Sequence, residues 1–192
     1  MTSPPQQYHY ELRIPKERVA ILIGKGGETK QHLEQHTQAS IQVDSQEGDV
    51  HITGSDVILL FQLREIIKAV GRGFNPDIAI QLLKSDYSFE LISLNDYSKH
   101  KNHQQRMKGR VIGKAGKTRG VIEQLTQTNI SVYGKTIGVI GVIEQVGLAT
   151  KAIDMLLQGS PHANVYKWLE KKTKHAFEHD IEVREGFEKY VE

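Results

Sequence analysis

The stretch Ile23-Gly24-Lys25-Gly26-Gly27 recurs further along the chain as Ile112-Gly113-Lys114-Ala115-Gly116. The two stretches lie 89 positions apart, and at this spacing the similarity continues beyond the glycines without a gap. The matching pairs are Thr29 and Thr118, Lys30 and Arg119, Leu33 and Ile122, Thr37 and Thr126, Ile41 and Ile130, and Val43 and Val132. Agreement over about twenty residues indicates a duplicated structural unit. We therefore expect two copies of one fold.

The residues around the first glycine loop predict the element order β-α-α-β-β-α. Tyr8 to Ile14 alternates apolar and polar residues, as a half-buried strand does, and ends at Pro15. Asp56 is a suitable N-cap for the last helix. The expected helices are 16–23, 28–37 and 56–70, and the two further strands are 40–44 and 50–53.

The second copy repeats this order, with a longer helix before its loop and a tighter hairpin. Its expected strands are 89–94, 129–133 and 136–140, and its expected helices include 99–112 and 142–157. A short helix at 78–83 is predicted between the copies, and an extra one at about 163–177. We divide the chain into a first domain (1–72), a connecting helix or linker (73–85), a second domain (86–160), and a C-terminal helix with an acidic tail (161–192).

Composition excludes several classes of protein. The chain has 192 residues and no cysteine, so disulfides, thiolate catalysis and cysteine-bound zinc are excluded. It lacks both the run of about 18 apolar residues that a membrane-spanning helix needs and a signal peptide, so we expect a cytoplasmic protein. The net charge of +2 is too small to indicate nucleic-acid binding.

The distribution of charge is more informative than the total. Residues 99–119 contain no acidic residue, whereas residues 178–192 contain six acidic residues against two basic ones. The basic residues of the first stretch are Lys99, Lys101, Arg106, Lys108, Arg110, Lys114, Lys117 and Arg119. A charged stretch is usually only a solvated face, but this one contains a glycine loop.

A Gly-X-X-Gly turn between two helices can hold a phosphate group. Without Cβ atoms the backbone approaches the anion closely, and the N–H groups that open the next helix face it. One such turn is more often a turn only, but two at matching positions favour a clamp. The predicted backbone-binding residues are Gly24, Lys25, Gly26, Gly27, Lys30, Arg106, Lys108, Arg110, Gly113, Lys114, Ala115, Gly116, Lys117 and Arg119. The apolar groove for the bases is predicted at Ile112, Ile122 and Ile130.

Other kinds of site find little support. A Walker-type nucleotide loop ending at Gly116-Lys117-Thr118 would need a glycine at position 111, which is Val111. His32 and His36 lie one helical turn apart, but no third metal ligand is evident. No nucleophile-base pair is recognisable either. We expect a protein without catalytic activity, cofactor or metal.

The sequence Arg13-Ile-Pro-Lys-Glu-Arg-Val-Ala-Ile-Leu-Ile-Gly-Lys-Gly-Gly27 resembles the signature of KH (K-homology) domains. The resemblance implies an α+β fold of two tandem type I KH domains, each a three-stranded antiparallel sheet packed on three helices, plus the C-terminal helix. KH modules hold about four nucleotides of single-stranded RNA, with the glycine loop on the backbone.

The stretches Lys108–Arg119, Ile130–Thr136 and Pro161–Tyr166 resemble the archaeal partner-of-Nob family, also called the Dim-two group. Lys30 and Arg119 share with this group and the related Krr group a basic residue three positions after the loop. This resemblance implies assembly of the small ribosomal subunit, with binding near the 3′ end of the rRNA precursor and cooperation with the Nob endonuclease. An archaeal source is expected, because the long N-terminal extension of eukaryotic relatives is missing.

Two other functions remain open at this point. One is a general KH regulator of mRNA or single-stranded DNA, and the other is a scaffold that binds protein. The second domain is expected to dominate RNA binding, because acidic residues balance the basic ones in the first. Arg106 and Arg110 would form a phosphate track along the helix, or one of them would brace the fold by pairing with Asp96 or Glu123.

Overall fold

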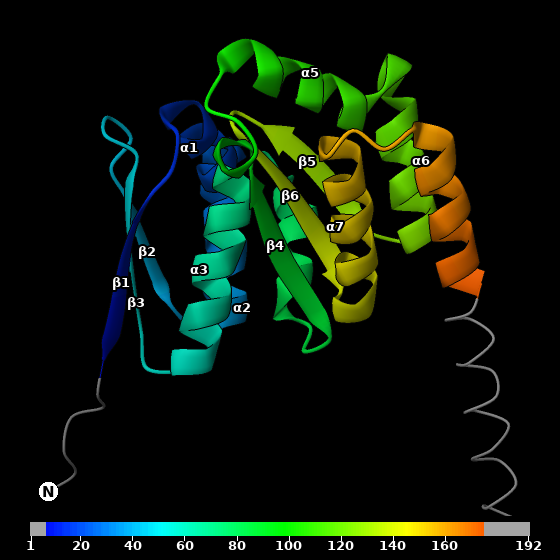
Figure 1. Ribbon diagram of the computed structural model, residues 1–192. Coiled ribbons are helices and arrows are strands. Elements are labelled where there is room, and N and C mark those ends of the chain that lie inside the picture. Colours follow the sequence, from blue (N-terminus) through cyan, green and yellow to red (C-terminus); the bar gives the residue numbers. More distant parts are fainter. Residues whose placement is uncertain (1–6, 175–192) are drawn as a thin grey trace, which may run out of the picture.

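Residues 7–174 are described by the computed structural model, which contains two units of the predicted order and a C-terminal helix (Figure 1). The first unit comprises β1 (Tyr8–Arg13), α1 (Lys16–Ile23), η1 (Lys25–Gly27), α2 (Glu28–Thr37), β2 (Ser40–Val43), β3 (Asp49–Gly54) and α3 (Val57–Gly71). The connection comprises α4 (Pro76–Ala79) and η2 (Ile80–Leu83). The second unit comprises β4 (Tyr87–Ser93), η3 (Leu94–Asp96), α5 (Lys101–Ile112), η4 (Lys114–Gly116), α6 (Lys117–Thr126), β5 (Asn129–Tyr133), β6 (Thr136–Val142) and α7 (Ile143–Leu157).

Each unit contains a three-stranded antiparallel sheet with its last strand in the middle. The strand orders are β1-β3-β2 and β4-β6-β5. In the first sheet Ile52 of β3 pairs with Tyr10 of β1 and with Ile41 of β2. In the second sheet Ile140 of β6 pairs with Phe89 of β4. The predicted three-stranded sheets packed on three helices are confirmed in both units.

The third helix of the first unit begins where the sequence predicts it. The Asp56 side chain accepts hydrogen bonds from the N–H groups of Ile58 and Leu59, which satisfies two donors of the first turn. Leu60, Leu63, Ile66 and Ile67 of α3 are fully buried. Burial of this apolar face attaches α3 to the sheet.

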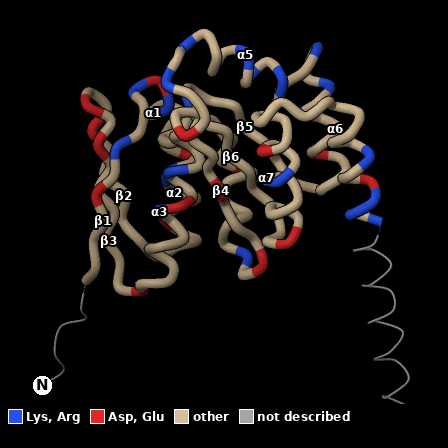
Figure 2. Tube along the Cα trace, in the orientation of Figure 1, with Lys and Arg blue, Asp and Glu red and all other residues tan. Residues whose placement is uncertain are grey.

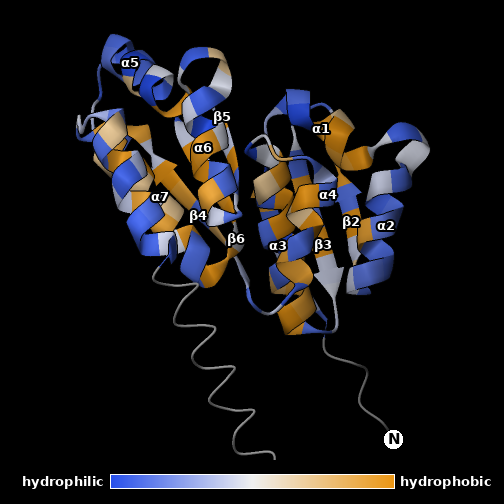
Figure 3. Ribbon diagram, turned by 90° about the vertical axis from the view of Figure 1, so that its right-hand side faces the viewer, coloured by the Kyte–Doolittle hydropathy of each residue, from blue (hydrophilic) through white to orange (hydrophobic). Residues whose placement is uncertain are grey.

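The two units stack in four layers, in the order sheet, helices, sheet, helices (Figures 1 and 3). The helices of the first unit therefore cover the outer face of the second sheet. Phe74 packs edge-on against Phe89, with ring centroids 5.9 Å apart, and Ile140 belongs to the core cluster of the first unit. A Cβ on Gly138 would lie 2.6 Å from the Phe74 ring, so this glycine allows the close approach.

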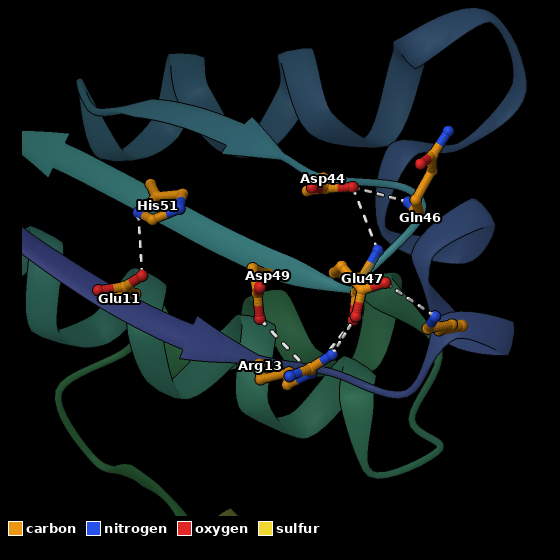
Figure 4. A network of polar contacts seen from close by, with 8 residues as sticks. Glu11, Arg13, Asp44, Gln46, Glu47, Asp49 and His51 are labelled. Carbon is orange, nitrogen blue, oxygen red and sulfur yellow. Dashed lines mark hydrogen bonds and ion pairs between the residues drawn. The ribbon is translucent and has the colours of Figure 1, made fainter.

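The outer face of the first sheet is polar and has no such cover in the described part of the chain. On this face the ring Nδ1 of His51 on β3 lies 3.7 Å from the carboxylate of Glu11 on β1, and Arg13 forms an ion pair with Asp49 at 3.5 Å (Figure 4). In the adjoining turn the Asp44 carboxylate accepts from the N–H groups of Gln46 and Glu47, which lowers its pKa. The stack ends at this face because its side chains are solvated.

The C-terminal helix runs through residues 162–174 and packs on the second unit. Val165 and Leu169 are buried in its core cluster, and Trp168 packs against the same cluster. The predicted end of this helix at Phe177 and the acidic tail at 178–192 lie outside the described residues. The domain limits at 72, 85 and 160 remain a prediction. Within residues 7–174 no helix is long and apolar enough to cross a bilayer.

Candidate nucleic-acid interface

The second glycine loop has a backbone that requires its glycines. Gly113 adopts φ 74° and ψ 177°, and Gly116 adopts φ 78° and ψ 5°. A Cβ on Gly113 would also lie 2.7 Å from the backbone nitrogen of Thr118. Ala115 takes φ 52°, a strained conformation for a residue with a Cβ. The loop therefore opens directly into the first turn of α6, where no side chain caps the helix.

The first glycine loop has nearly the same backbone. Gly24 adopts φ 76° and ψ 175°, Gly26 takes φ 63° at the position of Ala115, and Gly27 takes φ 86°. Like Gly116, Gly27 donates its N–H to the carbonyl of the loop's first glycine at 3.3 Å. Both loops could therefore present backbone N–H groups to a phosphate, and they differ in the side chains around them.

The groove at the second loop and the groove that lies just after the first loop differ in charge. A groove of about 480 Å³ at the second loop is lined by Arg106, Gly109, Arg110, Gly113, Lys114, Lys117, Thr118 and His162, without an acidic residue. A groove of about 410 Å³ beside α2 is lined by Glu28, Thr29, His32, Leu33, Pro76, Asp77 and Ile80, without Lys or Arg. Figure 2 shows the corresponding run of basic residues along α5 and α6. The groove at the second loop therefore offers the more favourable surroundings for a phosphate, because charge supplies most of the affinity for a nucleic-acid backbone.

Arg110 does not extend into solvent as the predicted phosphate track requires. Its Nε donates to the carbonyl of Leu156 at 2.9 Å, and its Nη2 donates to that of Ser160 at 2.6 Å. Arg18 makes the same pair of bonds in the first unit, to Val70 and Phe74. Each arginine thus donates hydrogen bonds to carbonyl groups at the C-terminal end of the third helix of its unit. Arg110 is a bracing residue, bound to carbonyls rather than to the expected Asp96 or Glu123.

The basic residue three positions after each loop forms a local ion pair. Arg119 lies 3.6 Å from Glu123, and Lys30 lies 3.7 Å from Glu34. Glu123 also accepts from the backbone N–H of Ile130 at 2.8 Å, at the start of β5. This glutamate therefore ties the basic residue to the strand beside the groove, and the charge of Arg119 is partly compensated.

The three predicted groove residues differ in accessibility. Ile122 and Ile130 are 0% and 5% exposed and belong to the core, whereas Ile112 is half-buried. Only Ile112 could touch a base without rearrangement. Ile122 and Ile130 belong to the hydrophobic core cluster of the second unit.

The C-terminal helix contributes residues that were not predicted as part of the site. His162 lies beside the second loop, and its ring hydrogen-bonds the Arg110 carbonyl at 2.9 Å. The Tyr166 hydroxyl donates to the Thr118 hydroxyl at 3.0 Å, at the start of α6. Pro161–Tyr166 is one of the stretches that resemble the partner-of-Nob family, and this resemblance could have indicated that the C-terminal helix contributes to the site.

We expect the substitutions Arg106→Gln and Arg110→Gln to have different effects, the first on RNA binding and the second on stability. Arg106 is exposed and lines the groove, so Arg106→Gln should flatten the log-log salt dependence of RNA binding by about 0.7, the value for one phosphate of a single strand. Arg110→Gln should instead lower the melting temperature by several degrees, because two carbonyls lose a charged donor, roughly 1.5–3 kcal/mol each at most. Anisotropy titrations over a salt series and thermal melting measure the two effects. A flattened slope without a change in melting for Arg110→Gln would contradict this assignment.

Comparison with known proteins identifies both units. The model of the "Eukaryotic type KH-domain (KH-domain type I)" matches residues 88–174, and the model of the "KH domain" matches residues 9–68. The chain is 44% identical over 165 residues to the KH domain-containing protein MJ0443 of Methanocaldococcus jannaschii, covering 84% of this chain and 72% of that protein. It is 30% identical to the pre-rRNA-processing protein pno1 of Aspergillus fumigatus, covering 84% of this chain and 67% of that protein.

A solved structure is also similar over most of the chain. A chain in the crystal structure of the a/eIF2alpha-aDim2p-rRNA complex from Pyrococcus horikoshii OT3 is 40% identical and superimposes with a TM-score of 0.83, covering 88% of this chain and 96% of that one. The predicted resemblance to the partner-of-Nob, or Dim-two, family is confirmed. The chain belongs to the family of tandem KH-domain proteins that includes archaeal Dim2p and the pno1 pre-rRNA-processing proteins.

Proposed function

We propose that the chain binds single-stranded RNA at the second glycine loop and acts as an assembly factor of the small ribosomal subunit. The observation that carries this proposal is the acid-free groove where Arg106, Lys114 and Lys117 surround the loop. Exposed basic side chains supply attraction to the backbone, and the open first turn of α6 supplies N–H donors. The bases would then lie against Ile112.

The relatives support the identity of the RNA. The protein from Aspergillus fumigatus is named a pre-rRNA-processing protein, and the similar Pyrococcus chain comes from a complex that contains rRNA. We therefore propose the 3′ region of the small-subunit rRNA precursor as the ligand. The pre-ribosomal small subunit and the Nob endonuclease are proposed partners. A translation factor of the a/eIF2alpha type is a further candidate, because that complex contains one.

In this proposal the chain positions RNA in the cytoplasm and does not cut it. The candidate site contains basic and backbone donors, which bind phosphate, and no carboxylate lines its groove to act as a general base. Cleavage would belong to the partner endonuclease.

Crosslinking the protein to RNA in living cells and sequencing the bound fragments tests this function. The expected result is enrichment of fragments from the 3′ end of the small-subunit rRNA precursor. Fragments dispersed over many transcripts would instead indicate a general KH regulator. Very little crosslinked RNA would indicate a protein-binding scaffold, and either outcome would overturn the proposal.

A further inference from the structure

A second basic groove lies in the first unit, between β1 and α3 and away from either glycine loop. Its volume is about 560 Å³. Five basic residues line it, Arg13, Lys16, Arg64, Lys68 and Arg72, against two acidic ones, Glu11 and Glu47. We call it the first-unit groove. The excess of positive charge suits an anionic ligand.

Three of its cations form a stripe along α3. Arg64 and Lys68 are four residues apart and lie one above the other on a single face of α3, and Arg72 follows four residues later as the C-cap of this helix. The guanidinium of Arg64 lies over the Tyr10 ring, 5.3 Å from its centroid. Arg72 has no acidic partner within 4.0 Å among residues 7–174. Charges at one-turn spacing match a ligand that carries several negative charges in a row.

The second unit provides an internal comparison, because α7 has the same length as α3. The residues of α7 at the positions of Arg64, Lys68 and Arg72 are Thr150, Asp154 and Gln158. These side chains are used within the protein: Thr150 donates to Glu90 of β4 at 2.9 Å, and Asp154 accepts from Tyr97 at 2.9 Å. Burial and this carboxylate raise the pKa of Tyr97 to about 12, so its hydroxyl remains a donor at neutral pH. The fold therefore does not require a cationic stripe at this place.

The acidic residues near the first-unit groove compensate its charge only in part. Glu47 pairs with Arg13 at 2.6 Å and with Lys16 at 3.4 Å, and Asp49 lies 3.5 Å from Arg13. Glu65 lies 3.3 Å from Lys68 and 4.0 Å from Arg64, so only Arg72 of the five basic residues has no acidic partner within 4.0 Å in the described part of the chain. The side chains of Arg13 and Lys16 are 61% and 59% exposed. The ion pairs of Arg13 and Lys16 with Glu47, at such exposure, are worth only about 0–1 kcal/mol. They can be exchanged for contacts with a phosphate.

The end of the first-unit groove at Arg72 contacts β5 of the second unit, which leads into the turn between β5 and β6. The Ser131 hydroxyl of β5 donates to the carbonyl of Arg72 at 2.9 Å. At the turn itself the ammonium of Lys108 on α5 donates to the carbonyl of Gly134 at 3.2 Å, and Lys135 is exposed. The cations of α5 continue from there to the loop, and Figure 2 shows basic residues from α1 to α5 along the same end of the molecule. A strand held at the loop could follow this path without leaving the protein.

We propose that the first-unit groove is a second binding site for phosphates of the RNA strand that the second glycine loop holds. The proposal rests on the proposed function and extends the RNA contact onto the first unit, at a place other than its own glycine loop. A docked acidic protein is less favoured, because the exposed large apolar side chains of residues 7–174 all lie outside the groove. Protein interfaces need such anchors at their centre.

The test compares a short and a long single-stranded RNA on the full chain. A 5-nucleotide RNA should fill only the second loop, whereas a 20-nucleotide RNA with the same core should also reach the first-unit groove. Replacing Lys68 and Arg72 by Gln should leave binding of the short RNA unchanged. For the long RNA we expect a five- to tenfold loss of affinity and a salt slope flatter by about 1.4, since each phosphate contributes about 0.7.

Two further variants serve as controls. Arg13→Gln with Lys16→Gln changes the opposite wall of the groove and should give the same length-dependent loss, even if the first variant folds poorly. Lys84→Gln with Lys151→Gln removes the same charge elsewhere and should bind both RNAs like the wild type. Equal losses on both RNAs, or none on the long one, would overturn the second site. Binding of polyglutamate that these variants abolish, with long RNA unaffected, would show that the groove serves an acidic protein and would also overturn it.

The outcome is separable from the proposed function. Binding of the short RNA by the wild-type chain, and a preference for the precursor 3′ sequence over an unrelated one, test the second loop alone. If the wild-type chain bound the precursor 3′ sequence no better than an unrelated RNA, the proposed function would be contradicted. The comparison between short and long RNA would still test the second binding site.

Discussion

Changing Lys114 and Ala115 to Asp should reduce affinity for single-stranded RNA on the order of 100-fold, or about 2.7 kcal/mol. Both residues lie in the turn that faces the proposed phosphate, and the surrounding groove carries no acid. The substitution removes a cation and adds two negative charges where charged hydrogen bonds would form, at roughly 1.5–3 kcal/mol each. Asp tolerates the left-handed conformation at position 115, so the fold should persist. Anisotropy titration with a precursor 3′-end oligonucleotide measures the loss.

The matched control is Lys25→Asp with Gly26→Asp. These positions have the same backbone and receive the same change of charge, but the neighbouring groove is lined by Glu28 and Asp77. We expect less than a threefold loss there. Equal losses from the two double variants would show that both loops hold RNA and would contradict the asymmetry.

Gly113→Ala should destabilise the protein by about 3 kcal/mol and lower the melting temperature of the full chain by roughly 6–12 °C. The combination φ 74° and ψ 177° is almost restricted to glycine, and the new Cβ would lie 2.7 Å from the Thr118 backbone nitrogen. Relief of the clash must move the start of α6, so RNA affinity should also fall roughly tenfold at a temperature where the variant is folded.

Gly24→Ala is the control for this second substitution. Gly24 has φ 76° and ψ 175° and the same 2.7 Å approach to a backbone nitrogen, that of Thr29. It should cost similar stability without changing RNA affinity. Thermal melting and RNA titration of both variants measure these effects. If Gly24→Ala weakened RNA binding as much as Gly113→Ala, the account would be contradicted.

The order of elements and the candidate loop could be predicted because their signals are local. A glycine loop fixes backbone angles within four residues, and an N-cap such as Asp56 acts on the next turn. Because the sequence is repeated, the same order of elements could be predicted for both units. Helix α5 begins at Lys101 rather than Lys99, a difference of the size that frayed helix starts commonly show.

The stacking of the units and the role of Arg110 depend on contacts between distant residues. The sequence shows that Phe74 and Phe89 are apolar, but not that one covers the sheet that contains the other. Arg110 reaches carbonyls 46 and 50 residues away, so its charge looked available for RNA when only its neighbours along the helix were considered. Likewise, Ile122 and Ile130 have apolar side chains that fit either a groove or a core, and burial decides for the core.

Amide hydrogen exchange of the full chain, with and without a precursor 3′-end oligonucleotide, tests the central claim most directly. If the second loop holds the RNA backbone, the amides of Lys114 to Thr118 should exchange more slowly in the complex, because their N–H groups face phosphate or are covered by it. The amides of Lys25 to Thr29 should exchange at the same rate in both samples. Protection of the first loop alone, or of neither loop while RNA is bound, would contradict the account.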